Sequence, residues 1–212
     1  MLYFTMITTA VLLILFINIP FFVQNSLPIG LFFLYFILSV AMCGLISFVI
    51  MLIVHRCPKK LFNPYSKIFK TYKFENTLFN FLCVKKWKDK VPELGKLGGF
   101  EKNKLQNPKN AEYLYEFLVD SCKSEAIHTL SAIFGLTIFF IIPSQFTWVI
   151  TLPVFLVNFI CHYMPSIIQR YMRPRLIKLY EKVKLCQEIE IVKDNDDNTL
   201  YDGEELQEKT TN

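Results

Sequence analysis

The 212-residue chain is 53% hydrophobic with a mean hydropathy of +0.35, yet 19% of its residues are charged. The charges are segregated, because no Lys, Arg, Asp or Glu occurs in residues 1–55 or 126–169. This pattern excludes an ordinary soluble domain. It predicts an all-α integral membrane protein with cytoplasmic amphipathic or interfacial helices.

Residues 1–55 are predicted to form a transmembrane hairpin. A bilayer core about 30 Å thick requires about 20 apolar helical residues to cross it. Thr5–Val23 and Ile29–Val54 both meet this length, and Gln24–Pro28 forms a polar turn between them. No positive residue precedes the first apolar run and no A-x-A-like site follows it, so we expect no cleaved signal peptide.

Residues 126–169 are predicted to form a second transmembrane hairpin. Ala126–Pro165 is about twice the length of one span, and Ile142–Gln145 lies near its middle. We therefore expect about four transmembrane helices, with a re-entrant hairpin over 126–169 as the alternative. Asn158 and His162 lie in this stretch, where we expect satisfied polar residues of the core.

Basic residues next to the spans predict the orientation in the membrane. They follow the second and fourth spans: Arg56, Lys59, Lys60, Arg170, Arg173 and Arg175. The two turns on the other side carry no charge. Since cytoplasmic loops carry an excess of Lys and Arg, we expect a multi-pass protein of the cell membrane with both termini cytoplasmic.

Residues 56–125 form a basic cytoplasmic or interfacial segment with a net charge of +7. Aromatic residues alternate with lysines from Tyr65 to Lys88, which is typical of helices at the headgroup boundary. A packed cytosolic subdomain is the alternative. A basic segment beside a membrane attracts anionic headgroups, and nucleic acid is not expected because no recognition motif accompanies the charge.

Helix signals continue after this segment. Pro92 and Gly95–Phe100 interrupt regular structure, and Asn107-Pro108 predicts the start of an amphipathic helix over Lys109–His128 that runs into the third span. Residues 170–192 are predicted to form a basic amphipathic helix. Residues 193–212 are predicted to form a disordered acidic tail.

The entry to the third span carries the most informative polar residues. Asp120, Glu125 and His128 share one arc of the helix with Ser121 and Ser124. His128 could act as a general base on a hydroxyl, with Glu125 or Asp120 orienting the imidazole. A helix cap, or an ion pair with nearby lysines, is the alternative interpretation.

Arg170, Arg173 and Arg175 form a second candidate site. Arginine binds phosphate or carboxylate through two parallel hydrogen bonds, which suits a lipid headgroup or the diphosphate of an acyl donor. Anchoring of the fourth span by positive charge is the alternative. No cofactor motif is found, and the six cysteines and the histidines lack metal-ligand or disulfide spacing.

Three segments in order resemble the glycosyl-diaponeurosporenoate acyltransferases of Gram-positive bacteria. They are Lys86–Gly95, Asp120–His128 and Pro165–Leu176, similar to the family's W-K-x-x-x-x-x-x-G, E-T-x-R-A-E-x-x-H and Q-R-Y-N-R-x-R segments, and the resemblance covers about residues 60–185. The matching positions are Trp87, Lys88, Glu125, His128, Gln169, Arg170, Tyr171, Arg173 and Arg175. The chain departs from the family pattern at Asp120, Lys123, Ser124 and Met172.

The resemblance implies acyl transfer from a fatty acyl donor to the sugar of a carotenoid glycoside, as in staphyloxanthin-type biosynthesis, or of a related glycolipid. It also implies that Trp87, Lys88, Gln169, Arg170, Tyr171, Arg173 and Arg175 contribute to substrate binding, assisted by Lys86. The alternative is a non-catalytic membrane scaffold of a lipid-synthesis complex. A methyltransferase would require a nucleotide-cofactor site that the sequence does not show.

Overall fold

The computed structural model describes residues 2–25, 29–91 and 105–208, and these contain no β-strand, as expected for an all-α protein. The α-helices are α1 (Leu2–Asn25), α2 (Ile29–Arg56), α3 (Lys73–Phe81), α4 (Val84–Trp87), α5 (Ala111–Phe134), α6 (Ile138–Ile141) and α7 (Leu152–Glu208). The short helical turns are η1 (Lys59–Phe62), η2 (Lys88–Lys90), η4 (Gly135–Thr137), η5 (Ser144–Phe146) and the π-helical η6 (Thr147–Thr151).

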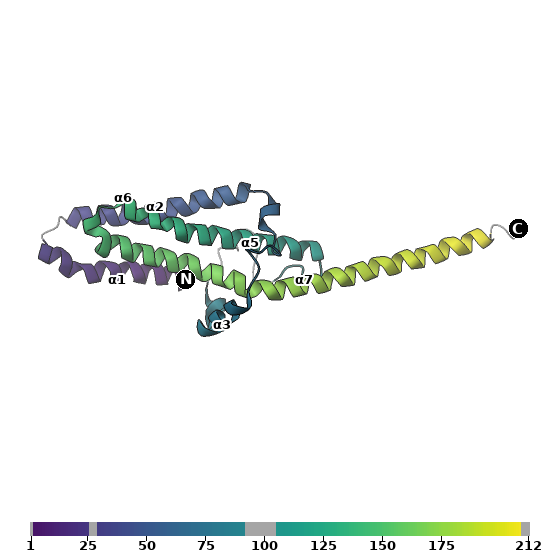
Figure 1. The fold of residues 1–212 in the computed structure, drawn as a ribbon. Coiled ribbons are helices and arrows are strands. Elements are labelled where there is room, and N and C mark those ends of the chain that lie inside the picture. Colours follow the sequence, from purple (N-terminus) through teal and green to yellow (C-terminus); the bar gives the residue numbers. More distant parts are fainter. Residues whose placement is uncertain (1, 26–28, 92–104, 209–212) are drawn as a thin grey trace.

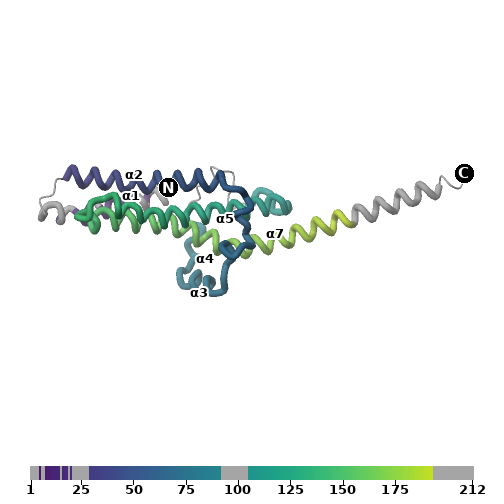
Figure 2. The backbone as a smooth tube through the Cα atoms, turned by 45° about the horizontal axis from the view of Figure 1, so that its top comes forward, coloured from purple at the N-terminus to yellow at the C-terminus, as the bar shows by residue number. Residues whose placement is uncertain are grey.

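The long helices form an elongated bundle. α1, α2, α5 with α6, and the first part of α7 lie side by side, and α3 and α4 lie on one flank (Figures 1 and 2). α5 and α7 pack against each other along their length. α7 then leaves the bundle and projects beyond it (Figure 1).

Three helical segments of the described chain are long and apolar enough to cross a membrane: Ile29–Arg56, Ala111–Ile141 and Ser144–Val192. They contain the second, third and fourth expected spans. The first expected span falls in α1, where Thr8–Asn18 is an apolar helical segment shorter than a membrane span. The described residues therefore support three candidate spans, one fewer than the sequence predicted.

The chain reverses direction within residues 126–169, where the sequence predicts a transmembrane hairpin, and the crossing of a membrane by this hairpin stays a prediction. α6 ends at Ile141, Ile142 follows in an extended conformation before Pro143, and η5 and η6 lead into α7, which runs back along α5. The predicted start of α5 was wrong by a few residues. Asn107 accepts a turn hydrogen bond from the backbone N–H of Asn110, and Asn110 is the N-cap, its side chain accepting from Tyr113 N at 3.0 Å.

α7 joins two elements that the sequence analysis separated. It continues through the predicted boundary at Val192 to Glu208, so the helix extends into the segment for which we expected disorder. Pro165 and Pro174 lie inside the helix, and each releases the carbonyl four residues earlier from its backbone hydrogen bond. The interruption predicted at Pro92 and Gly95–Phe100 lies outside the described residues.

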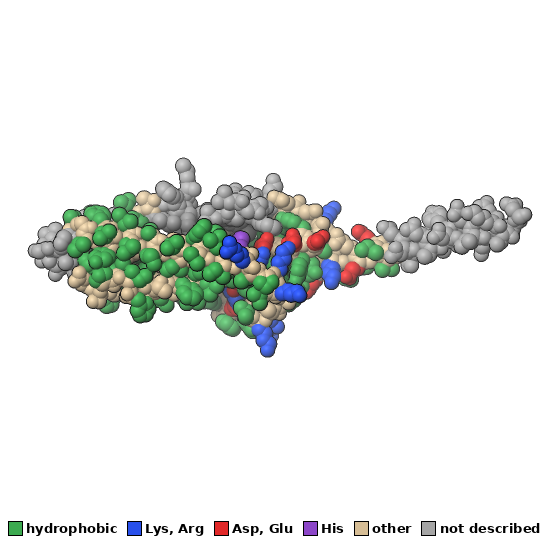
Figure 3. All heavy atoms as spheres, turned by 90° about the horizontal axis from the view of Figure 1, so that it is seen from above, with side chains coloured by type: hydrophobic (Ala, Val, Ile, Leu, Met, Phe, Trp, Pro, Cys, Tyr) green, Lys and Arg blue, Asp and Glu red, His purple; other side chains and the backbone are tan. Residues whose placement is uncertain are grey.

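Apolar and charged side chains occupy different parts of the surface, as they do in the sequence. Large apolar side chains such as Phe140 and Trp148 are exposed on the bundle, as expected for a surface in contact with lipid. In the view of Figure 3, one half of the bundle shows hydrophobic side chains without charge, and charged side chains gather toward the end from which α7 projects. The boundary between these two regions is where the candidate site lies.

Candidate active site

A cluster of ion pairs joins α3, α5 and α7 at this boundary. Arg170 on α7 donates from Nε and Nη2 to the two carboxylate oxygens of Glu75 on α3, both at 2.7 Å. Its Nη1 donates to Oε1 of Glu125 on α5 at 2.6 Å. Both contacts to Glu75 are parallel, which is the strongest geometry for a guanidinium and a carboxylate.

Arg173 extends the same cluster into the protein. Its side chain is fully buried, and its Nη1 lies 2.6 Å from Oε2 of Glu125 as an ion pair and donates to the carbonyl of Phe69 at 2.8 Å. The cluster therefore contains two arginines and two glutamates, with no net charge. Such pairing is required because an unpaired buried charge is strongly destabilising.

Glu75 is the member of this cluster that sequence reasoning missed. It is the one acidic residue between Arg56 and Lys88. A single carboxylate in a basic segment was the sequence feature that could have indicated an ion pair with an arginine. Burial raises the pKa of Glu75, but hydrogen bonds from Arg170 and from the backbone N–H of Tyr72 outweigh it, so the pKa lies below its ordinary value. Glu75 is thus ionised at neutral pH and holds α3 against α7.

Gln169 and the backbone carbonyl of Arg170 make further hydrogen bonds from α7 to α5 and to the segment before α3. Ser121 donates to Oε1 of Gln169 at 2.8 Å, and Nε2 of Gln169 donates to Ser124 at 3.3 Å. The hydroxyl of Thr71 donates to the carbonyl of Arg170 at 3.1 Å. Pro174 has no N–H to bond this carbonyl within the helix. The carbonyl of Arg170 is therefore available to Thr71, and this hydrogen bond holds the segment before α3 against α7.

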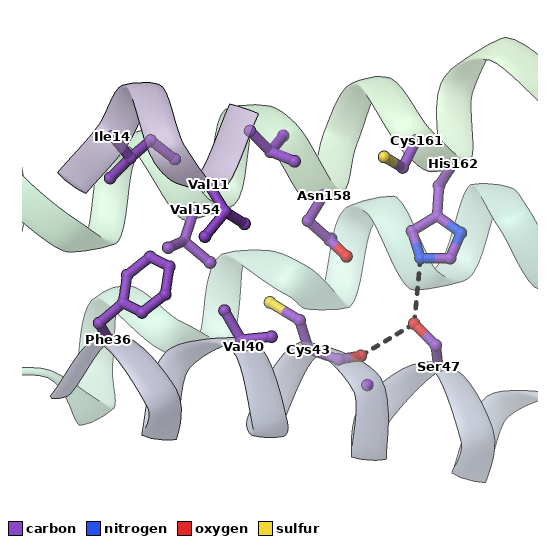
Figure 4. Close-up of a pocket in the computed structure, with 12 residues that line it drawn as sticks. Val11, Ile14, Phe36, Val40, Cys43, Ser47, Val154, Asn158, Cys161 and His162 are labelled. Carbon is purple, nitrogen blue, oxygen red and sulfur yellow. Dashed lines mark hydrogen bonds between the residues drawn. The ribbon is translucent and has the colours of Figure 1, made fainter. Parts of the chain in front are cut away.

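Two histidines face each other across α5 and α7. Nδ1 of His128 and Nδ1 of His162 are 3.1 Å apart, and Nε2 of His162 lies 3.1 Å from Oγ of Ser47 on α2. Ser47 donates in turn to the carbonyl of Cys43 at 2.9 Å (Figure 4). His162 therefore has specific partners on two helices, a more definite position than the core role expected from sequence.

The expected acidic partners of His128 face other groups. Both carboxylate oxygens of Glu125 lie 2.6 Å from arginine nitrogens. Asp120 pairs with Nζ of Lys123 at 3.3 Å, two turns before His128. The polar residues expected on one arc of α5 have separate partners, because Glu125 lies in the arginine cluster, His128 in the histidine pair, and Asp120 pairs with Lys123.

The aromatic residues of the family motifs are packing residues. Nε1 of Trp87 donates to the carbonyl of Leu82 at 2.8 Å, and Trp87 packs with Phe79, Val84 and Tyr171 in one apolar cluster. Tyr171 meets Phe79 edge to face. These contacts hold α3 and α4 against α7.

The remaining basic residues of the predicted site lie outside the buried cluster. Nζ of Lys88 pairs with the carboxylate of Asp89, and Lys86 is exposed. Arg175 is exposed and lies over the ring of Tyr171, donating to its hydroxyl at 3.2 Å. Of the three predicted arginines, Arg175 is the one that solvent or a headgroup reaches most directly.

An apolar pocket of about 290 Å³ adjoins the histidine pair. Residues of α1, α2 and α7 line it, with His162 and Ser47 at one end and Phe36 and Ile14 at the other (Figure 4). Apart from Ser47, Asn158 and His162, the lining side chains are apolar or cysteine thiols. The site thus combines a titratable pair, a neutralised ion cluster and a hydrophobic pocket.

The described residues, with helices, three candidate membrane spans and a histidine pair beside an apolar pocket, define a membrane-compatible helical protein. The sequence model of the glycosyl-4,4'-diaponeurosporenoate acyltransferase family matches residues 65–182, which is more than half of the chain. The protein belongs to this family, whose name implies acyltransferase activity. No curated protein and no solved structure matches the chain in the same comparisons.

Proposed function

We propose that this protein is a membrane acyltransferase that esterifies a sugar hydroxyl of a carotenoid glycoside, or of a related glycolipid, with a fatty acyl chain. The observation that carries the proposal is the His128–His162 pair beside an apolar pocket. Ionisable residues among membrane-spanning helices are costly and are usually functional. The family supplies the reaction class.

Hydrogen bonding supports an assignment of the histidine tautomers. Ser47 donates its proton to the carbonyl of Cys43, so its oxygen accepts from Nε2–H of His162. A neutral His162 then has a lone pair on Nδ1, which accepts from Nδ1–H of His128. In this tautomer His128 carries its lone pair on Nε2, and this is the nitrogen that accepts a proton.

This tautomer makes His128 the general base of the proposed reaction. Nε2 takes the proton of the sugar hydroxyl as the oxygen attacks the acyl carbonyl. The ester bond forms, the bond between the acyl group and its donor breaks, and the leaving group takes the proton. His162 and Ser47 act as positioning residues, a role that we first assigned to Glu125 and Asp120.

The ion cluster has a supporting role in this proposal. Glu125, Arg170 and Arg173 lie one to three turns from the histidines on the same two helices, and they fix α5 against α7. Lys86, Lys88 and Arg175 are left to bind the phosphates of the acyl donor or of lipid headgroups. Arg170 and Arg173 are given a structural role here because glutamates already neutralise their charges inside the protein.

We further propose that α1 crosses the membrane beside the three candidate spans, which gives four spans with both termini in the cytoplasm. α1 carries no charged residue, and Nδ2 of Asn18 donates to the carbonyl of Val149 in η6 at 3.0 Å. The basic residues after α2 and in α7 then lie on the cytoplasmic side. Reporter fusions at the two termini and after Gln145 test this arrangement.

The test of the reaction uses isolated membranes that contain the full-length protein. Acyl transfer from a fatty acyl thioester to a purified carotenoid glycoside is measured for the wild type and for His128→Ala. Loss of a general base should lower kcat by about 10²–10⁴-fold. His55→Ala is the matched control, since His55 lies at the exposed end of α2.

The competing function, a non-catalytic scaffold, makes the opposite prediction. A scaffold retains its function without His128 and loses it when the exposed lysines and arginines are neutralised. Lipid analysis of a deletion strain adds a second test, because loss of an acyltransferase should cause the non-acylated glycolipid to accumulate. Full acyl transfer by His128→Ala would contradict the proposed base.

A further inference from the structure

The apolar pocket between α1, α2 and α7 is a second site whose role follows from its contents. Its lining contains Val11 and Ile14 from α1, Phe36 and Val40 from α2, and Val154 from α7. None of these side chains can form a hydrogen bond. The pocket is therefore suited to hydrocarbon, and two of the three helices that line it, α2 and α7, contain candidate spans.

The polar residues of the pocket lie toward one end. Figure 4 shows His162 and Ser47 at that end and Phe36 and Ile14 at the opposite end, with Asn158 in between. His162 is hydrogen-bonded to His128, the proposed base. A ligand with a reactive polar group and a long apolar tail would thus place the reactive group beside the histidines.

We propose that this pocket holds the fatty acyl chain of the donor, with the acyl carbonyl beside His162 and the chain extending toward Phe36. This inference rests on the proposed acyl transfer and adds the site that selects the donor. A volume of about 290 Å³ lies at the lower limit of the roughly 300–1,000 Å³ found for small-molecule pockets. A flexible alkyl chain can bend into such a space, whereas the long rigid polyene of a carotenoid acceptor is better accommodated along the exposed apolar surface.

The pocket therefore sets the acyl-chain length that the protein uses. Each methylene group buried contributes about 0.8 kcal/mol, so a chain that fills the pocket binds more tightly than a shorter one. A chain longer than the pocket gains nothing from its extra methylene groups unless they leave through an opening. Reducing the volume should shift the preference to shorter chains.

Gly44 provides a way to reduce the volume without a clash. It lines the pocket, and a Cβ atom added there would meet no atom within 4 Å. Gly44→Leu should place its side chain in the empty space, and leucine is also the better helix former. Gly30→Leu is the matched control, because Gly30 lies in the same helix, has equally open space around it and does not line the pocket.

The experiment compares wild type, Gly44→Leu and Gly30→Leu in isolated membranes with acyl thioesters of increasing chain length. Gly44→Leu should lower kcat/KM for long chains by about tenfold or more, which corresponds to losing two buried methylene groups, and should leave short chains nearly unaffected. Gly30→Leu should retain the wild-type profile. Identical profiles for all three proteins would overturn the pocket assignment and leave the proposed reaction intact.

A second measurement works without turnover. A fatty acyl thioester with a diazirine at the chain end is photo-crosslinked to the full-length protein in phospholipid vesicles, and the labelled peptides are identified. Label on the peptides around Phe36 and Ile14 that Gly44→Leu reduces supports the pocket, even if no acyl transfer is detected with any donor. Label that is equal in all variants indicates general contact with lipid and overturns the inference.

Discussion

Glu125 holds two arginines together, and removing its charge is the sharpest test of how the site is built. Glu125→Gln keeps the shape of the side chain but leaves Arg173, which is fully buried, without its ion-pair partner. Arg170 retains both hydrogen bonds to Glu75. The cost of the substitution should therefore come mainly from Arg173.

The magnitude follows from that burial. Breaking a buried ion pair by removing one partner costs about 3–5 kcal/mol. For a chain of this size 1 kcal/mol shifts Tm by about 2–4 °C, so Glu125→Gln should lower Tm by roughly 6–20 °C. Thermal unfolding in detergent micelles, followed by a thiol-reactive dye at buried Cys43 and Cys122, measures this shift.

Glu116→Gln is the matched control on the same helix. Glu116 pairs with Lys59 at 2.6 Å, but both side chains are at least half exposed, and exposed pairs contribute little. Removing both buried charges with Glu125→Leu and Arg173→Met should recover most of the lost stability, and keeps the test valid if Glu125→Gln fails to fold. The reasoning is refuted if Glu125→Gln lowers Tm no more than Glu116→Gln does.

Three further substitutions test other contacts. Folding lowers the pKa of Glu75, so the ionised carboxylate contributes its full stability above the unfolded pKa of 4.5 and loses it as the pH falls through the lower folded pKa. The Tm difference between wild type and Glu75→Gln should therefore be constant near neutral pH and should shrink in acid. Gly135→Ala should cost about 1–3 kcal/mol, because its Cβ would meet Nδ2 of Asn158, and adding Asn158→Ala should relieve this. Trp87→Phe removes the hydrogen bond to Leu82, which should cost about 0.5–1.5 kcal/mol and speed proteolysis near α4.

Each of these has an outcome that contradicts it. A pH-independent difference for Glu75→Gln would mean that its carboxylate is not held by Arg170. If Asn158→Ala fails to improve Gly135→Ala, the two residues are not in contact. Unchanged proteolysis of Trp87→Phe would show that the hydrogen bond does not hold α4 in place.

The sequence predicted the parts of the fold that depend on local properties. Charge-free stretches predicted the apolar helices, and Pro143 lies where the chain reverses direction between α6 and α7. The start of α5 was placed at Asn107 instead of Asn110, because Pro108 makes Asn107 the stronger cap signal in the sequence. The structure distinguishes them only through the hydrogen bond from Tyr113.

The arrangement of the site could be predicted only in part. Spacing on one helix placed Glu125 and His128 on a common arc, but it could not show which partners other helices bring. Glu125 meets arginines from 45 and 48 residues later in the chain, and His128 meets His162 from 34 residues later. Such pairs depend on the register of α5 against α7, which no local pattern encodes.

Pro174 affects how the segment before α3 docks against α7. In an unbroken helix each carbonyl in the middle is already bonded, and the segment before α3 would have no backbone acceptor on α7. The proline creates one at Arg170, and Thr71 uses it. Because successive residues of a helix are about 100° apart, moving the proline by one position would turn the free carbonyl away from Thr71 while leaving the composition of α7 unchanged. The missing N–H group of Pro174 thus adds one backbone contact to the side-chain contacts that Arg170 and Arg173 make with the segment before α3.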